Sequence, residues 1–522
     1  MTARNNNESD TTLERDRRIG DVEHLKRDLA GKSIRGSMSI AVSEVGCSIF
    51  RLAGTVILAR MLMPEHFGLI GMVTALTAFV EMFKDLGLGT ATIQQSEITH
   101  AQVSTLFWIN MGVGTLIMVL IAGASPLISW FYGDSRVLWV AIAISSSFFF
   151  GGLTIQHKAL LLRHMYFSRV ALIQVSSTAS GFAIGIFLAW QGFEYWALVW
   201  KEVCRVIVEA TGVWLLYRWL PGLPKRRSGI GMLLRTGKYL TGFNVVVFLS
   251  RNLDQILLGK FWGPVSVGLY KQAGQLLLLP GSLFSFPLTY IMTPALSSLQ
   301  DEPERYRKYY KNVVSFLCFC YMPTIAYLAV YSESIVALVL GEKWIASSSV
   351  LRILAFAAFV EPIINTCGIV MVTYGRTSAY FRWGVITGTS LAIAVCIGVN
   401  WGLTGVATAI VIYTYLTLLP LLWFSFKDTP ISISVCFEAV SPSAFASVAM
   451  SVLLVMIGYT FQPSTALAEI GFSLLVAPLL YCGVWVLLPG GKQTLIEHWS
   501  HLRLALEGLP FGARSRGVRV RT

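Results

Sequence analysis

The residues of this sequence that could do chemistry are charged side chains inside long apolar segments. An Arg or Lys at the centre of a membrane-spanning helix costs about 2.5–3.5 kcal/mol on insertion scales. So many charges are too costly to face lipid, and most must line a wet cavity or pair with one another. The set consists of Glu44, Arg51, Glu81, Lys84, Asp85, Lys201, Glu202, Arg205, Glu209, Arg251, Asp254, Lys271, Arg352 and Glu361.

Four cations of this set are suited to binding an anion. Arg51 and Arg251 occupy equivalent places in two similar halves of the chain, and Lys84 and Lys271 lie on the helices expected to follow them. A guanidinium presents a planar fork of donors to phosphate oxygens. These four residues are the predicted site for a multivalent anion, with the two arginines as its principal members. Structural ion pairs between helices would explain the same charges, so both interpretations stay open.

Other polar groups accompany the cations. Four amides crowd two successive predicted helices near Arg251 and could line a polar path, although interhelical hydrogen bonds worth about 0.6 kcal/mol each are the alternative. They are Asn252, Gln255, Gln272 and Gln275. Three intramembrane acids could carry a proton if transport uses a coupling ion; they are Glu81, Asp85 and Asp254.

Motifs of enzymes are absent from the sequence. It has no GxxxxGK[ST] phosphate loop, no Gly-x-Ser-x-Gly elbow and no HExxH motif. The loops expected outside are short, whereas a membrane glycosyltransferase or polymerase usually needs a sizeable catalytic loop. The eight cysteines form no CxxC pair, and the seven histidines lack ligand spacing. We therefore expect no catalysis, no cofactor and no metal.

The composition identifies the elements that must position these residues. Of the 522 residues, 55% are hydrophobic and 13% are charged, against about 25% charged in a typical soluble protein. The apolar residues come in blocks of about 20, enough to cross a bilayer core of roughly 30 Å. A soluble enzyme, a disordered scaffold and a secreted disulfide protein are excluded, and the predicted fold is an all-α polytopic membrane protein. Fourteen spans are predicted, at about 37–62, 67–90, 103–124, 136–156, 168–190, 195–217, 236–259, 265–291, 312–331, 347–373, 379–399, 402–425, 442–461 and 467–488.

The distribution of basic residues predicts the orientation. If the N-terminus is cytoplasmic, the inside segments and their margins hold 30 Lys and Arg, and the outside ones hold four. This asymmetry places both termini in the cytoplasm. Residues 1–36 have no apolar core, so no cleavable signal peptide is expected.

The predicted spans form two similar halves. Arg51, Arg60, Pro64 and Gly68 recur as Arg251, Lys260, Pro264 and Gly268, at one constant offset. Six helices per copy place both copies in the membrane in the same direction, related by an axis along the membrane normal with a cavity between them. Chance recurrence of Pro-Gly turns is the alternative.

These repeats predict the domain organisation. A basic Pro/Gly stretch links the halves, and the basic, weakly amphipathic tail is expected to lie on anionic lipid. The segments are a cytoplasmic tail (1–36), a first bundle (37–218), a linker (219–235), a second bundle (236–426), two extra helices (442–488) and a basic cytoplasmic tail (489–522).

Three apolar motifs resemble those of a known family. They are the exit of the first helix, Ile57–Gly68, the end of the second, Phe83–Ala91, and the start of the twelfth, Gly402–Ala407. With two six-helix bundles and two extra helices, the chain resembles the multidrug/oligosaccharidyl-lipid/polysaccharide exporter superfamily. Within it, the chain is most similar to the bacterial lipopolysaccharide and exopolysaccharide flippases of the Wzx type.

The resemblance implies an inner-membrane flippase for an undecaprenyl-diphosphate-linked oligosaccharide. The four cations would hold the diphosphate, the four amides would line the glycan path, and rocking of the halves would give alternating access. Membrane lipids are expected partners, polysaccharide polymerase or export proteins are further candidates, and nucleic acid is not expected. A multidrug or organic-cation antiporter of the same superfamily and a flippase for a lipid-linked peptidoglycan precursor are the alternatives.

Overall fold

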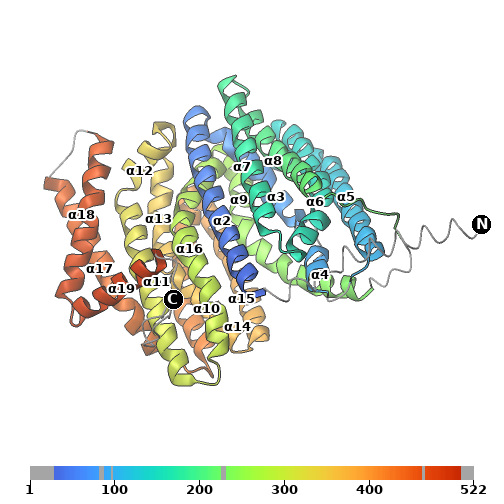
Figure 1. Ribbon diagram of the computed structural model, residues 1–522. Coiled ribbons are helices and arrows are strands. Elements are labelled where there is room, and N and C mark those ends of the chain that lie inside the picture. The colour runs from blue at the N-terminus through green and yellow to red at the C-terminus, as the bar shows by residue number, and fades with distance from the viewer. Residues whose placement is uncertain (1–28, 82–86, 96–97, 225–230, 461–464, 507–522) are drawn as a thin grey trace, which may run out of the picture. The chain divides into compact units, whose positions relative to one another are not determined.

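The structure is a computed structural model that describes residues 29–81, 87–95, 98–224, 231–460 and 465–506. For residues 29–43, 45, 81, 231–251, 286, 287, 290 and 501–506, it describes the backbone alone. Every regular element in the described ranges is a helix (Figure 1). Eight of these helical stretches are long and apolar enough to span a membrane. The fold is therefore that of an all-helical membrane protein.

The chain divides into two compact units. The first comprises residues 1–271 and 384–406, and the second comprises residues 272–383 and 407–522. The described helices of the first unit are α2 (Leu29–Met61), α3 (Pro64–Glu81), α4 (Leu88–Gln94), α5 (His100–Tyr132), α6 (Arg136–Arg163), α7 (Phe167–Trp190), α8 (Tyr195–Leu216), α9 (Gly231–Pro280) up to Lys271, α15 (Thr377–Gly398) from Gly384, η4 (Val399–Trp401) and the first turn of α16 (Gly402–Phe426).

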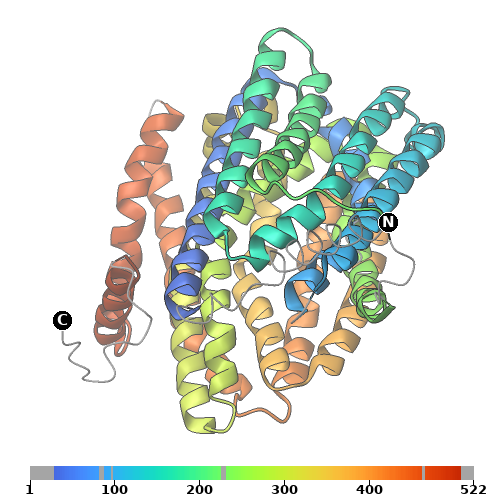
Figure 2. The same ribbon diagram turned by 45° about the vertical axis from the view of Figure 1, so that its right-hand side comes forward.

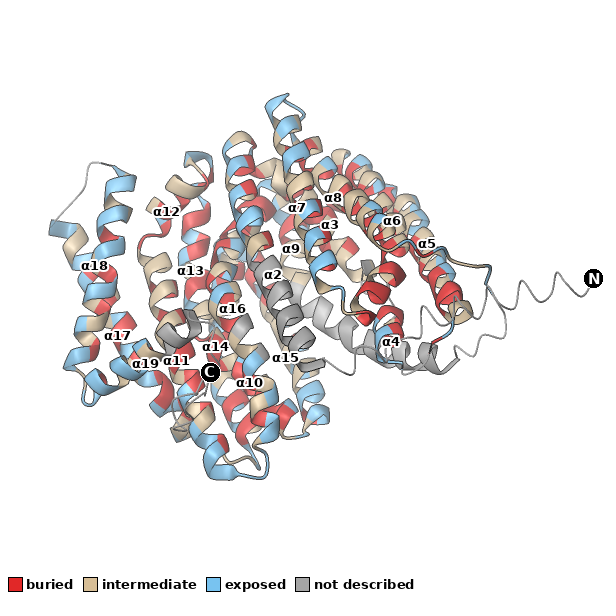
Figure 3. Cartoon of the chain, in the orientation of Figure 1, coloured by how far each residue is buried: buried red, intermediate tan, exposed pale blue. Residues whose placement is uncertain are grey.

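Small residues let neighbouring helices of the first unit approach closely, as is usual in membranes. Helices α5 and α6 lie side by side (Figures 1 and 2). A Cβ atom on Gly114 would lie 2.5 Å from the carbonyl oxygen of Phe148, and one on Gly152 would lie 2.8 Å from that of Asn110. The opposite face of α5 exposes large apolar side chains such as Leu127 and Trp130 (Figure 3). An exposed apolar face of this kind suits contact with lipid.

Local signals explain where several helices begin and end. Pro64 stands at the first position of α3, where its missing N–H is not needed. Thr99 and Gln102 form a reciprocal capping box at the start of α5, and Gly133 ends that helix in the left-handed conformation (φ 72°). These signals set the start of α3, which borders the cavity described below, and both ends of α5.

Within the described ranges, the predicted spans fall on helices, with differences in detail. Of span 67–90, the structure describes α3 up to Glu81 and the start of α4. Spans 236–259 and 265–291 are joined in α9, which is interrupted at Gly263 (φ 76°, ψ −177°) before Pro264. Span 347–373 is broken at Val360, because Pro362 cannot donate a helical hydrogen bond at the start of the second piece. A short helix, α12 (Ser332–Val339), occupies a segment predicted as an outside loop.

The first part of the predicted linker is packed against the first unit. The Trp219 side chain is buried beside α5 and α6. Trp108 Nε1 donates to the carbonyl oxygen of Gly222 at 2.8 Å, and the Gly222 N–H donates to Ser104 Oγ at 2.9 Å. Residues 219–222 are therefore anchored to the bundle that precedes them.

The second unit is a further helical bundle. Its cores lie between α11, α14 and α17 and between α11, α17 and α18. Besides the last turns of α9, the first turns of α15 and most of α16, its described elements are η2 (Gly281–Ser285), α10 (Phe286–Ser298), α11 (Pro303–Val330), α12, η3 (Glu342–Trp344), α13 (Ser347–Phe359), α14 (Glu361–Thr373), α17 (Ile433–Thr460), α18 (Ala466–Leu487) and α19 (Gly491–Leu506).

The segment predicted as a surface tail contains α19. Its buried side docks on α11, where His498 packs against Phe319 with ring centroids 4.9 Å apart and lies 3.2 Å from Ser315 Oγ. Its other side exposes Ile496 and Trp499. Helix α19 therefore packs on the bundle with one side and exposes apolar side chains on the other.

Candidate functional site

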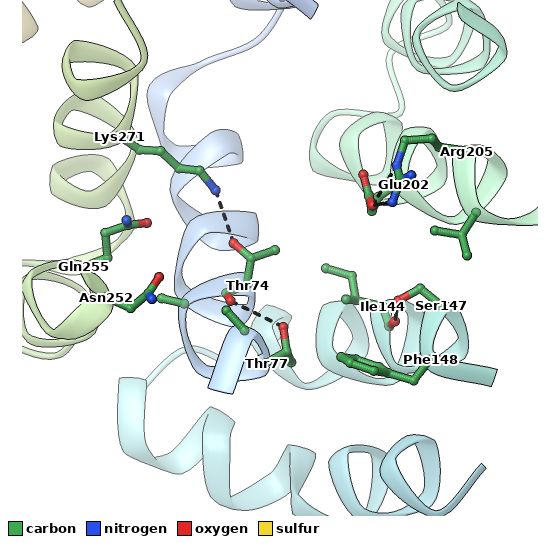
Figure 4. Close-up of a pocket in the computed structure, with 13 residues that line it drawn as sticks. Thr74, Thr77, Ile144, Ser147, Phe148, Glu202, Arg205, Asn252, Gln255 and Lys271 are labelled. Carbon is green, nitrogen blue, oxygen red and sulfur yellow. Dashed lines mark hydrogen bonds and ion pairs between the residues drawn. The ribbon is translucent and has the colours of Figure 1, made fainter. Parts of the chain in front are cut away.

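A polar cavity of about 280 Å³ lies within the first unit (Figure 4). Helices α3, α6, α8 and α9 form its walls. Hydroxyl, amide and charged groups mix there with small and apolar side chains, which is unusual at the depth of apolar helices. The lining residues are Thr74, Ala75, Thr77, Ala78, Ile144, Ser147, Phe148, Glu202, Arg205, Val206, Asn252, Gln255 and Lys271.

Helix α8 contributes the charges of one wall. Glu202, Arg205 and Glu209 are three and four residues apart, so they share one helical face. Arg205 donates through Nη2 and Nε to Glu202 Oε1 at 2.6 and 3.0 Å, and through Nη1 to Glu209 Oε2 at 3.1 Å. Lys158 of α6 donates to the other oxygen of Glu209 at 2.9 Å. The four groups form a charge network that ends at the cavity.

Helix α9 contributes Lys271 from the opposite side of the cavity (Figure 4). Its ammonium donates to Thr74 Oγ1 of α3 at 3.2 Å. Gly71, one turn earlier on α3, permits this approach, because a Cβ atom there would lie 2.7 Å from Val267 Cγ1. Lys271 is also close enough to Glu202 to interact electrostatically with it. An arginine and a lysine thus face one polar space, which suits an anion.

Three predicted site residues come together at this cavity. Lys271, proposed for the anion, lines it with Asn252 and Gln255, proposed for the glycan path. The other two amides belong to the second unit, where Gln272 is buried and Gln275 is exposed.

Arg51 lies outside the cavity lining and has its own partners. Its Nη2 donates to Glu44 Oε1 at 2.5 Å and to Ser48 Oγ at 3.2 Å, and half of its side chain is exposed. Gln174 of α7 donates to the other oxygen of Glu44 at 2.8 Å. The role predicted for Arg51 stays a prediction, and its described contacts are those of an ion pair within α2, whose carboxylate also accepts a hydrogen bond from α7.

The remaining predicted residues are described only in part. Asp254 accepts from the Tyr270 hydroxyl at 2.7 Å and from the Gln255 N–H at 2.8 Å. Arg251 is on α9 and Glu81 ends α3, but their side chains lie outside the described residues, as do Lys84 and Asp85 entirely.

Sequence reasoning included Glu202 and Arg205 among the intramembrane charges but did not assign them to the site. On α8 the structure joins opposite charges three and four residues apart, Arg205 with Glu202 and Glu209. The sequence could have predicted these ion pairs, because residues three and four apart on a helix are neighbours, and this spacing places Arg205 between two carboxylates. The cavity hydroxyls of Thr74, Thr77 and Ser147 carried no comparable signal.

Within the described ranges, no group of three or more His, Cys, Asp or Glu residues is placed to hold a metal ion.

Comparisons with known proteins agree with this architecture. The chain is 26% identical over 468 residues to the teichuronic acid biosynthesis protein TuaB of Bacillus subtilis, covering 88% of this chain and 96% of that protein. It is 24% identical over 442 residues to the lipopolysaccharide biosynthesis protein WzxC of Escherichia coli, covering 82% of this chain and 89% of that one.

A solved structure of the lipid II flippase MurJ in an inward closed conformation has the same fold. The TM-score is 0.70 at 15% identity, covering 85% of this chain and 97% of the flippase. A family model described as polysaccharide biosynthesis protein matches residues 57–349, more than half of the chain. The chain therefore belongs to the polysaccharide biosynthesis protein family.

Proposed function

We propose that the protein is a flippase that moves an undecaprenyl-diphosphate-linked oligosaccharide across the bacterial inner membrane, for lipopolysaccharide or exopolysaccharide assembly. The observation that carries this proposal is the cavity among α3, α6, α8 and α9, where Arg205 and Lys271 face one polar space from opposite sides. The names of TuaB and WzxC support a role in making a surface polysaccharide, and that of MurJ supports movement of a lipid-linked precursor.

The cavity chemistry suits the headgroup of such a lipid. The guanidinium of Arg205 would grip one phosphate and the ammonium of Lys271 the other. Asn252 and Gln255 would meet the first sugar, since amides can donate to and accept from hydroxyls. The isoprenoid tail would stay in the bilayer.

We propose alternating access by two six-helix halves in a fourteen-helix chain whose termini are both cytoplasmic. A reciprocal contact supports the repeat: a Cβ atom on Gly68 would overlap the Pro264 carbonyl oxygen, and one on Gly268 would overlap that of Pro64. A twofold relation between the halves would produce such a contact. The membrane potential can supply the drive, at about 2.3 kcal/mol per charge per 100 mV, and Asp254 is the described acid available for a coupling ion.

Binding to the purified protein tests the proposed substrate. We expect undecaprenyl diphosphate to bind more tightly than undecaprenol in native mass spectrometry. Arg205→Ala/Lys271→Ala should weaken that binding by at least about 100-fold, because it removes two charge-assisted hydrogen bonds that each contribute about 1.5–3 kcal/mol.

Arg305→Ala is the matched control, because Arg305 is exposed and pairs with Glu302 in the second unit. It should bind like the wild type. If the protein binds an organic cation and does not bind undecaprenyl diphosphate, the proposal is wrong and a multidrug or organic-cation antiporter is the better assignment.

A further inference from the structure

Arg205 is held by two carboxylates that differ in position. Glu202 takes the Nε and Nη2 edge of the guanidinium, and Glu209 takes Nη1. Glu202 lines the cavity, whereas Glu209 lines a separate small pocket beside Lys158 and Gln174. One carboxylate therefore occupies the edge of Arg205 that a ligand in the cavity would use, and the other anchors Arg205 from behind.

The edge taken by Glu202 is the one best suited to phosphate. The parallel Nε–H and Nη2–H groups of an arginine grip two oxygens of a carboxylate or a phosphate in the same way. A phosphate entering the cavity must therefore compete with Glu202 for the same donors. Because Glu209 also binds Arg205, a phosphate would be a third anion on one guanidinium, and repulsion between the anions would favour departure of Glu202.

The cavity has enough positive charge to bind a dianion even while the Glu202 carboxylate is present. Arg205 and Lys271 line it, and Lys201 is close enough to interact electrostatically with Glu202 and Lys271. Glu209 on the far side of Arg205 is compensated by Lys158. Against the single charge of Glu202, the three cations then leave a net charge of about +2, equal in size to the charge of a diphosphate diester.

We propose that Glu202 is the resident counter-anion of this site. Its carboxylate occupies Arg205 when the carrier is empty, and a phosphate of the lipid diphosphate displaces it when the carrier is loaded. Glu209 keeps Arg205 in position during the exchange. This inference rests on the proposed function and adds a role in affinity and release to a residue outside the predicted anion site.

The physical advantage of the arrangement is compensation in both states. Without Glu202, the empty cavity would hold Arg205 and Lys271 with Glu209 as the remaining carboxylate on Arg205, and uncompensated charge among apolar helices is expensive. A second internal anion therefore favours the return of the empty carrier. The same anion lowers the affinity for the substrate and so favours its release. Glu202 thus lowers the affinity for the substrate and raises the rate at which the carrier completes its cycle.

The test compares Glu202→Gln with Glu209→Gln, two isosteric changes on the same arginine. We expect Glu202→Gln to bind undecaprenyl diphosphate about tenfold more tightly, a usual size for two ligands coupled through one site. In vesicles, its half-saturating concentration and its maximal rate of flipping should both fall. Glu209→Gln should not tighten binding, because it loosens the anchor of Arg205. Glu202→Asp, which keeps the charge, should restore affinity toward that of the wild type.

The outcomes separate the two proposals. If undecaprenyl diphosphate binds the wild type no better than undecaprenol, the proposed function fails. If the wild type binds it and Arg205→Ala/Lys271→Ala does not, but folded Glu202→Gln binds with unchanged or weaker affinity, only the counter-anion proposal is overturned. Folding of each variant is checked by its melting temperature and its gel-filtration profile.

Discussion

Charged side chains of the described helices are compensated by nearby groups. Arg205 lies between two carboxylates, Arg51 pairs with Glu44, and Asp254 accepts from the Tyr270 hydroxyl. Such pairing reduces the penalty of placing a charge among apolar segments. The structural interpretation of these charges and the binding interpretation are therefore compatible: an ion pair can hold a side chain in place and still exchange its partner.

One ion pair outside the spans gives a prediction for pH. Asp134 accepts from Arg136 through N and Nε at 2.9 and 3.1 Å, and Arg136 also contacts Glu65 at the start of α3. The hydrogen bond from Arg136 holds the pKa of Asp134 below its ordinary value of 3.8. A carboxylate with a lowered pKa stabilises the fold at neutral pH, and this contribution is lost as the pH falls through the folded pKa.

We therefore expect Asp134→Asn to lower the melting temperature by a few degrees at pH 7. The difference from the wild type should shrink below about pH 4, where the wild-type carboxyl also becomes protonated. Melting curves at one scan rate, at pH 7, 5 and 3.5, measure this. A difference that stays constant down to the lowest pH would argue against the ion pair.

At the scale of elements, the crossing of α3 and α9 depends on two glycines. Gly68 and Gly268 each face the carbonyl oxygen of a proline one turn before the other. The two helices thus meet backbone to backbone, as small residues allow in membranes. The same arrangement carries Lys271, one turn further along α9, to Thr74.

Adding one methyl group at this crossing should separate the helices. We expect Gly68→Ala and Gly268→Ala each to lower the melting temperature by several degrees, because overpacking a close contact costs about 1–3 kcal/mol. Gly274→Ala is the control, since a Cβ atom on this α9 glycine would meet nothing within 4 Å. It should be neutral or slightly stabilising. Equal effects at all three positions would show that the crossing has no special role.

At the scale of the whole molecule, the distribution of Lys and Arg predicts the topology. Thirty Lys and Arg residues lie in the predicted inside segments and their margins, on the same side of the membrane as the N-terminus, and four lie in the predicted outside ones. Fusions of green fluorescent protein and of alkaline phosphatase measure the result. We expect green fluorescent protein fused to the C-terminus to fluoresce, and alkaline phosphatase fused there to be inactive, because both fusions would lie in the cytoplasm.

A phosphatase inserted near Lys343, in a predicted outside loop, should be active and serves as the positive control. An active phosphatase at the C-terminus would reverse the orientation or change the parity of the helix count. The result therefore tests the predicted number of spans as well as the cytoplasmic termini.

Much of the fold could be predicted because hydropathy is a local property. The apolar runs coincide with helices, and the motifs at Ile57–Gly68 and Gly402–Ala407 indicated the family that the family model confirms. The interruptions within helices were harder to predict. The interruption at Val360 and the single joint at Gly263 depend on how the following prolines are accommodated in a packed bundle.

The candidate site could be predicted only in part. Lys271, Asn252 and Gln255 were found because unusual residue types stand out in an apolar sequence. Glu202 and Arg205 stood out equally, but whether they face a cavity depends on the rotation of α8 about its axis. That rotation is set by packing against α3, α6 and α7, from distant parts of the chain.

The sequence by itself determined the class of protein, the positions of most helices and the family, since each follows from residues close together in the chain. Only the tertiary structure decided that Arg205 and Glu202 face the cavity, that Lys271 meets Thr74, and that Arg51 has its partners elsewhere. The physical reason is that ion pairs and cavities form between side chains on different helices or turns. Their positions follow from how the helices pack, which no local pattern specifies.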